Sequence, residues 1–264
     1  MALIVIYDSG VGGLSIYQEV IERSPYHDYV FVSDNAAFPY GTKSDGELIP
    51  RVIALCSVIA EKYQPDVLVV ACNTASTVAL SQLRDKFSFD IVGVVPAIKP
   101  AAQMSVSKVI GLLATPATVD RYYTQRLISD FAGGCQTITL GSSELVQIAE
   151  DKLHGESVDH AKIATILAPI LNTDSLDTLV LACTHFPLLR DEIKRIFDEN
   201  NRSIDLVDSG SAIAKRVQHF VESYEQDSNA RFNRIAVFTR PLESTRMRSH
   251  LMRIGFAEPE HLIL

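Results

Sequence analysis

The sequence lacks an excess of basic residues. Its 24 Lys and Arg residues are outnumbered by 32 Asp and Glu residues, which leaves a formal net charge of −8. Proteins that bind the phosphate backbone of nucleic acids need clustered positive charge to displace counterions. Nucleic acid is therefore not expected as the main partner of this protein.

Long apolar runs are also missing. The apolar start, residues 3–7, is too short for the core of a signal peptide and has no basic residue before it. No apolar run approaches the length of a membrane span. The chain begins directly with its first predicted strand, so no amino-terminal extension is expected. We predict a cytoplasmic protein with no membrane partner.

Cysteine is scarce, and the spacing of the cysteines indicates neither a disulfide scaffold nor a metal cluster. The four cysteines follow neither a CxxC pattern nor the dense spacing of a disulfide scaffold, and a cytosolic setting keeps them reduced. A free cysteine usually packs as a small apolar side chain, so each one needs its own argument for reactivity. Cys56 lies in a helical apolar pattern and Cys135 follows a glycine pair at a strand entry. Both are predicted to be packing residues.

The remaining composition is that of a folded α/β protein. A chain of 264 residues with 47% hydrophobic residues can bury a substantial core. Short β-branched runs alternate with amphipathic segments of helix length, which predicts mainly parallel sheets flanked by helices. The predicted strands cover residues 3–7, 28–33, 67–71, 91–94, 108–113, 136–140, 178–182, 204–207 and 235–238.

Two helices carry clear start signals. Ser44 and Glu47 form a candidate capping box before the apolar run 48–59, and Pro187 suits a first helical turn. In the helix that follows, apolar residues recur at helical spacing and are predicted to face the core. They are Leu189, Ile193, Ile196 and Phe197.

An internal repeat surrounds two of the cysteines. The stretches 66–72 (DVLVVAC) and 177–183 (DTLVLAC) match at Asp, Leu, Val, Ala and Cys, and the tripeptide DSG follows an apolar strand at both 8–10 and 208–210. Both cysteines fall at the carboxyl end of a predicted strand, where open α/β sheets place their ligands. Both precede hydroxyl or amide side chains that can cap a helix whose N–H groups face an anion. The repeat favours two similar halves. No low-complexity stretch or long polar linker separates them, so their limits are expected at tight crossovers near 95–96 and 208–209.

Two facing halves would place the thiols of Cys72 and Cys183 on opposite sides of one ligand. Inverting a stereocentre that carries hydrogen requires one group to remove a proton from one face and another to return a proton to the opposite face. Cysteine, with a reference pKa of about 8.5, can do either near neutral pH. The carbanion is a much stronger base than a thiolate, so the site must supply electrostatic help.

Several nearby residues are candidates for that help. His185 can lower the pKa of a thiol or relay its proton, and Asp8 ends the first strand at the same crevice. Taken singly, His185 is equally consistent with a helix cap and Asp8 with an Asx turn. Zinc bound by Cys72, Cys183 and His185 is conceivable, but no fourth ligand stands at a telling spacing, so no metal is expected.

The glycines that follow Asp8 do not form a dinucleotide fingerprint, because Ser15 stands where its third glycine belongs. Gly10, Gly12 and Gly13 are instead predicted to form a tight turn that approaches a small ligand closely.

Together, the motifs resemble glutamate racemases, the cofactor-independent members of the aspartate/glutamate racemase superfamily. The resemblance covers nearly the whole chain through DSGVGGLS (8–15), PYG (39–41), ACNTAS (71–76), ACTHFPLL (182–189) and DSG (208–210). It implies two α/β domains, residues 1–95 with 208–264 and residues 96–207, around a substrate cleft. It also implies racemisation of L- and D-glutamate without a cofactor, a role in peptidoglycan synthesis, and allows for a homodimer.

The resemblance further assigns roles to single residues. Cys72 and Cys183 would be the catalytic acid/bases, assisted by Asp8 and His185 respectively. Glu150 matches the family's assisting glutamate by position only, since its segment lacks the usual Cys-Pro start, and a plain surface helix explains it equally well. The substrate contacts implied are Asp8, Ser9, Pro39, Tyr40, Gly41, Asn73, Thr74, Thr115, Thr118, Thr184 and His185.

Other functions remain open at this point. An aspartate racemase or a related thiol-dependent decarboxylase would share the fold. A Cys183/His185 acyl-transfer enzyme would leave Cys72 unexplained. A non-catalytic module that binds amino acids could also use two lobes around a cleft.

Overall fold

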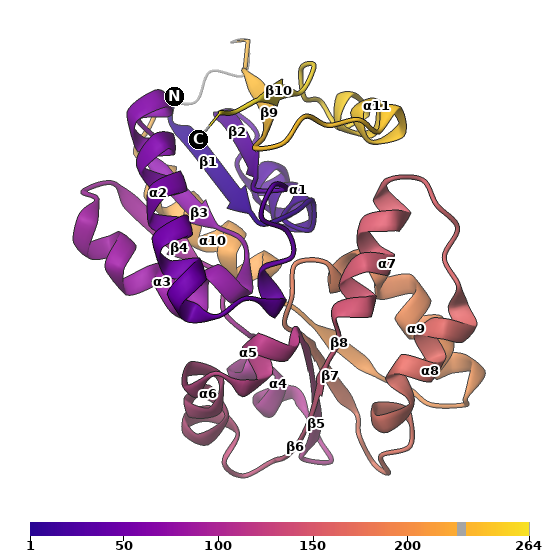
Figure 1. Cartoon of the computed structure of the whole chain (residues 1–264). Helices are drawn as coiled ribbons and strands as arrows, with labels where there is room; N and C mark the ends of the chain where they lie inside the picture. Colours follow the sequence, from indigo (N-terminus) through magenta and orange to yellow (C-terminus); the bar gives the residue numbers. More distant parts are fainter. Residues whose placement is uncertain (226–230, 264) are drawn as a thin grey trace.

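The computed structural model describes residues 1–225 and 231–263, which form two parallel β-sheets flanked by helices. The larger sheet has the strand order β10-β9-β2-β1-β3-β4, and the smaller has the order β6-β5-β7-β8. Among these residues, every strand pairing is parallel. Figure 1 shows the two sheets in separate lobes, with the amino-terminal and carboxyl-terminal segments sharing one lobe. The predicted fold class is confirmed.

All nine predicted strands are confirmed, with ends that differ by no more than one residue. They are β1 (Leu3–Asp8), β2 (Asp28–Ser33), β3 (Val67–Val70), β4 (Asp90–Gly93), β5 (Val109–Ala114), β6 (Gln136–Gly141), β7 (Thr178–Leu181), β8 (Asp205–Val207) and β9 (Arg234–Phe238). The prediction missed β10 (Glu260–His261), which pairs with β9. Two exposed polar residues at a sheet edge carry neither alternation nor β-branched side chains.

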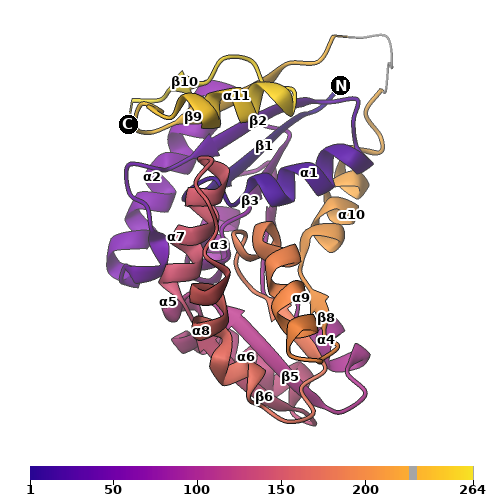
Figure 2. The same cartoon turned by 90° about the vertical axis from the view of Figure 1, so that its right-hand side faces the viewer.

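Helices cover both faces of each sheet because the strands bury both faces. Along β1, Ile4 and Ile6 enter one apolar cluster, whereas Val5 and Tyr7 enter another. The first cluster contains α1 (Leu14–Arg23), α10 (Gly210–Val221) and α11 (Thr245–Arg253), and the second contains α2 (Asp45–Tyr63) and α3 (Asn73–Lys86). Figure 2 shows α1 and α10 side by side.

The smaller sheet repeats this arrangement. Leu179 and Leu181 of β7 pack with α7 (Ser143–Leu153), α8 (His160–Leu171) and α9 (Arg190–Glu199), while Val180 faces the opposite cluster. That cluster includes α4 (Ile98–Met104), α6 (Tyr122–Ala132) and the edge of the short α5 (Pro116–Asp120). Among the described residues, no helix is both long enough and apolar enough to cross a bilayer.

Both predicted helix starts are confirmed. The Glu47 carboxylate accepts a hydrogen bond from the Ser44 backbone N–H at 3.0 Å and closes a capping box on α2. Pro187 lies in the first turn of a short 3-10 helix, Phe186–Leu189, that leads into α9. The apolar residues predicted to face the core, Leu189, Ile193, Ile196 and Phe197, are all buried.

The chain passes between the sheets twice. The first passage lies between β4 and α4, and the second between β8 and α10. The two passages are tied together, because the Ser209 hydroxyl donates to the Val95 carbonyl oxygen at 2.5 Å. The limits of the halves, near residues 95–96 and 208–209, stay a prediction, and both positions lie in these passages.

Candidate active site

The two halves meet at the carboxyl ends of their central strands. β1 ends at Asp8, and Cys72 precedes α3 two residues after β3. In the other half Thr115 caps α5 directly after β5, and Cys183 follows β7. One cavity is lined by both cysteines, and it also contacts Ser9, Phe38, Pro39, Tyr40, Gly41, Asn73, Thr74, Thr115, Ser143, Val146, Thr184 and His185. Thiols from separate halves therefore line the same cavity.

Cys72 lies among hydroxyl and carboxylate groups. Its side chain is only 5% exposed, and the thiol donates to the Ser9 hydroxyl at 3.6 Å. Burial, followed by the negative charge of Asp8, raises the pKa of Cys72 to about 12. The thiol is therefore protonated at neutral pH in the structure as it stands.

Asp8 is held behind Ser9. Its carboxylate accepts from the Ser9 backbone N–H at 2.5 Å and from the Thr184 hydroxyl, in the other half, at 2.7 Å. Burial raises the pKa of Asp8 above its ordinary value, although His185 and the Thr184 hydrogen bond act in the opposite direction. Asp8 thus links the two halves directly beneath the cavity.

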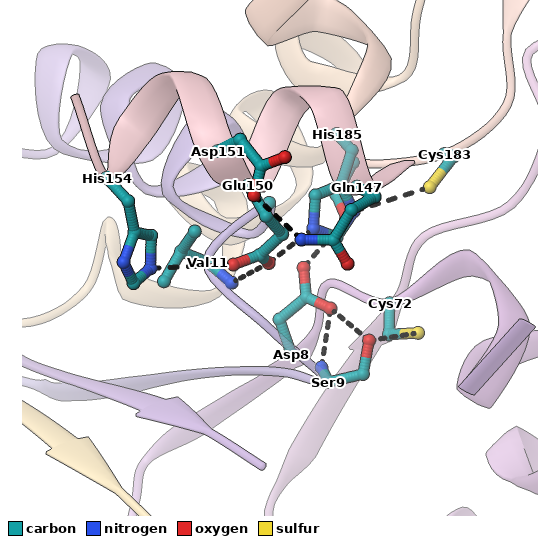
Figure 3. Close-up of polar contacts among 12 residues, drawn as sticks. Asp8, Ser9, Val11, Cys72, Gln147, Glu150, Asp151, His154, Cys183 and His185 are labelled. Atoms are coloured by element: carbon teal, nitrogen blue, oxygen red, sulfur yellow. Dashed lines mark hydrogen bonds and ion pairs between the residues drawn. The ribbon is translucent and has the colours of Figure 1, made fainter. Parts of the chain in front are cut away.

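Cys183 lies beside an imidazole. Its Sγ atom is 3.6 Å from Nδ1 of His185, and Nε2 of His185 is 2.7 Å from Oε1 of Glu150 (Figure 3). Burial acts to lower the pKa of His185, but the contacts with Cys183 and Glu150 outweigh it and hold the pKa well above the ordinary value. A protonated His185 can give a proton to Sγ or take one back.

Glu150 reaches this network from α7. The same Oε1 atom that contacts His185 accepts the backbone N–H of Val11 at 2.7 Å, so Glu150 also joins the two halves. Glu150 therefore contacts His185, although it does not itself line the cavity. The sequence contained no pairing signal for this contact, because it depends on how α7 packs against the loop of the opposite half.

The glycine-rich turn makes room for these side chains. A Cβ atom at Gly12 would lie 2.5 Å from Nδ1 of His185, and one at Gly10 would lie 2.2 Å from Oε1 of Glu150. A Cβ at Gly13 would lie 2.7 Å from Cβ of Asp8. The small glycines therefore let the turn approach these acid and base groups closely, and its predicted close approach to a ligand stays a prediction.

Two members of a hydroxyl cluster, Thr74 and Thr115, line the cavity. Thr74 Oγ1 lies 3.2 Å from both Thr115 Oγ1 and Thr118 Oγ1, and the last two are 2.9 Å apart. A Cβ at Gly41 would lie 2.6 Å from Cβ of Thr115, so the Pro39–Gly41 turn contacts the other half closely. The helix α3 begins at Asn73, directly before Thr74 of this cluster.

Most of the predicted substrate residues line the cavity directly. The exceptions are Thr118, which lies behind Thr115, and Asp8, which lies behind Ser9. Sequence reasoning missed Phe38, Ser143 and Val146, which also line it. Within residues 1–225 and 231–263, no group of three or more His, Cys, Asp or Glu side chains is arranged to hold a metal ion.

Comparison with known proteins agrees with this geometry. A family model described as Asp/Glu/Hydantoin racemase matches residues 12–217. The glutamate racemase of Salmonella gallinarum is 50% identical over 228 residues, which cover 86% of this chain and 80% of that protein.

Solved structures agree as well. Escherichia coli glutamate racemase in complex with L-glutamate and the activator UDP-MurNAc-ala superposes with a TM-score of 0.91 and 45% identity, covering 99% of this chain and 98% of that one. The Aquifex pyrophilus glutamate racemase gives a TM-score of 0.72 at 31% identity, covering 98% and 97%. This chain belongs to the Asp/Glu racemase family and, within it, to the glutamate racemases.

Proposed function

We propose that the protein interconverts L-glutamate and D-glutamate by a cofactor-independent mechanism in which Cys72 and Cys183 exchange protons with opposite faces of the α-carbon. The observation that carries the proposal is the single cavity lined by both thiols, one from each half. The acyl-transfer alternative uses only Cys183 and leaves Cys72 without a role.

In each direction, one cysteine acts as a thiolate and takes the α-proton, while the other acts as a thiol and gives a proton to the opposite face. The proton removed stays on the first sulfur and the proton added leaves the second, so the glutamate keeps its charge. His185 would transfer protons to and from Cys183. Asp8 and Ser9 would act on Cys72, whose raised pKa shows that its thiolate needs help to form.

The bound substrate itself can help the Cys72 thiolate to form. A bound amino acid carries an α-ammonium group, and a positive charge near the sulfur favours the thiolate. The same charge stabilises electron density that develops at the α-carbon in the transition state.

The proposed substrate site uses the hydroxyl cluster and the start of α3. Helix N-termini attract anions because their first N–H groups are free and the helix dipole is positive there. One glutamate carboxylate would bind to the N–H groups of Asn73 and Thr74 and to the threonine hydroxyls nearby. The residues proposed to hold the substrate are Ser9, Pro39, Tyr40, Gly41, Asn73, Thr74, Thr115, Thr118, Thr184 and His185.

The proposal includes the two-domain division, with residues 1–95 and 208–264 in one domain and 96–207 in the other. Parallel strands of separate sheets within each range support it. The D-glutamate produced would feed peptidoglycan synthesis. A cytoplasmic location stays a prediction from the sequence pattern, and a homodimer stays a prediction from the resemblance.

Solvent exchange tests the reaction. In deuterium oxide, each enantiomer of glutamate should lose its α-proton signal by NMR, with or without a chelator. Aspartate and an arylmalonate, offered to the same preparation, separate this activity from the related racemase and decarboxylase activities. No exchange from either enantiomer of glutamate would contradict the proposal.

A further inference from the structure

A second buried carboxylate lies behind the Cys72 half of the site. Asp34 directly follows β2, just as Asp8 ends β1, and its backbone N–H donates to the Asp8 carbonyl oxygen at 2.8 Å. Its side chain is fully buried and does not line the cavity. A carboxylate so placed needs partners for its charge, since an unpaired buried charge is strongly destabilising.

Every acceptor position of this carboxylate is used. Oδ1 accepts from Arg51 Nη2 at 2.6 Å and from the Thr239 hydroxyl at 2.7 Å. Oδ2 accepts from Arg51 Nε at 2.9 Å and from the Tyr40 hydroxyl at 2.5 Å. Two oxygens offer about four lone-pair sites, so the coordination is complete.

The four donors come from three separate segments. Arg51 lies on α2, Thr239 directly follows β9, and Tyr40 belongs to the Pro39–Gly41 turn that lines the cavity. The Tyr40 hydroxyl also accepts from the Tyr7 hydroxyl at 2.6 Å. Of these groups, Tyr40 alone lines the cavity, and it is therefore the route by which Asp34 can influence bound substrate.

The protonation states of Asp34 and Tyr40 determine which of the two donates the hydrogen bond between them. Burial acts to raise the pKa of Asp34, but the hydrogen bonds from Arg51, Tyr40 and Thr239 outweigh it and leave the pKa below its ordinary value. Burial, with the Asp34 charge next, raises the pKa of Tyr40, so the phenol keeps its proton and donates it. The Tyr40 ring is thereby held in one orientation.

We propose that Asp34 is a positioning residue for substrate binding, acting through Tyr40 to hold the Pro39–Gly41 turn against Thr115 of the opposite half. The turn then presents the backbone of Gly41, which also lines the cavity, to a carboxylate of the bound acidic amino acid in a fixed geometry. Asp34 itself touches neither substrate nor thiol. This inference rests on the proposed function, because the occupant of the cavity is taken to be glutamate.

The main test is the variant Asp34→Asn, which keeps the shape of the side chain but turns one acceptor into a donor. When a variant loses a contact that holds the substrate equally well in the ground state and the transition state, KM rises and kcat does not change. We expect KM for both enantiomers to rise about fivefold, the value of part of one hydrogen bond to a charged group, while kcat stays within about twofold. Asp85→Asn, an exposed position on α3, is the matched control and should leave both constants unchanged.

Tyr40→Phe separates positioning from a general loss of structure. If Asp34 acts through the Tyr40 hydroxyl, the double variant Asp34→Asn/Tyr40→Phe should raise KM no further than the larger of the two single variants. Both changes break the same contact. Additive effects of the two changes on KM would overturn the proposal, and so would an unchanged KM in Asp34→Asn. A fall of kcat together with a lost folding transition in urea would show that Asp34 only supports the fold, which also overturns it.

The two proposals fail in different ways. If the wild-type protein exchanges no α-proton of glutamate, the proposed function is wrong. If the wild type exchanges it and Asp34→Asn binds glutamate normally, only the positioning role of Asp34 is wrong.

Discussion

The two halves of the active site have the same strand-end cysteine but different surroundings. Cys72 contacts a hydroxyl and lies near a carboxylate, and burial raises its pKa to about 12. Cys183 contacts an imidazole whose pKa is held well above the ordinary value. The fold places two thiols in like positions, and the next few residues of each loop decide how each thiol handles its proton.

The largest test asks whether both halves are needed. Cys72→Ser and Cys183→Ser should each lower kcat for racemisation in both directions by about 10⁴-fold, because a hydroxyl is a far weaker acid than a thiol at the same position. Polarimetry of both enantiomers measures this. Cys135→Ser, a half-buried cysteine that does not line the cavity, is the control. Full activity in either active-site variant would contradict the two-thiol mechanism.

The second test asks whether Asp8 and His185 each assist a different cysteine. Asp8→Asn and His185→Asn should each lower kcat by about 10²-fold, since each removes one assisting acid or base. Because each residue serves one thiol, the primary deuterium isotope effect should rise for opposite enantiomers in the two variants. Equal isotope effects for both enantiomers in both variants would show that the halves are not distinct. His219→Asn, on α10 in an exposed pair with the Glu222 that follows the helix, is the control.

Alkylation measures the same difference without substrate. Thiolates react and thiols do not, so a pKa of about 12 leaves Cys72 almost entirely unreactive at pH 7.5. In a Cys135→Ser background, iodoacetamide should label Cys183, beside His185, at least about tenfold faster than Cys72. Peptide mapping by mass spectrometry measures how much of each cysteine, Cys72 and Cys183, is alkylated. Faster labelling of Cys72 would reverse the assignment of the two environments.

Much of this site could be predicted from the sequence because its main groups lie next to strand ends. Cys72, Cys183, Asp8 and His185 each lie within four residues of a strand end, and parallel strands bring their carboxyl ends to one edge of a sheet. The alternation of apolar runs and amphipathic segments was enough to locate nine strands within a residue.

What the sequence could not provide were contacts between the halves. Val146 lines the cavity from α7, the helix whose Glu150 also contacts the Val11 loop, and no local pattern encodes that approach. Asp34 has the same strand-end position as Asp8, but its role depends on donors from α2 and β9 that are distant in sequence. The small residues at Gly10 and Gly12 could be recognised as a turn, but not as space for Glu150 and His185.

The smallest expected effect on kcat concerns the contact between Glu150 and His185, which belongs to the Cys183 half. Glu150→Gln keeps the size of the side chain and removes the negative charge beside His185. Its kcat should fall about fivefold, as for a weakened hydrogen bond to a charged group.

The sign of the accompanying pH effect follows from the cause of the His185 shift. The contacts with Cys183 and Glu150 raise the pKa of His185, so loss of the Glu150 charge should lower that pKa. Activity that depends on protonated His185 is present below this pKa and is lost as the pH rises through it. The alkaline limb of the kcat/KM profile should therefore move to lower pH in Glu150→Gln, and stay in place in Glu144→Gln, an exposed position on the same helix. An alkaline limb unmoved by Glu150→Gln would mean that Glu150 serves only to hold the Val11 loop, and the two halves would then differ by the imidazole alone.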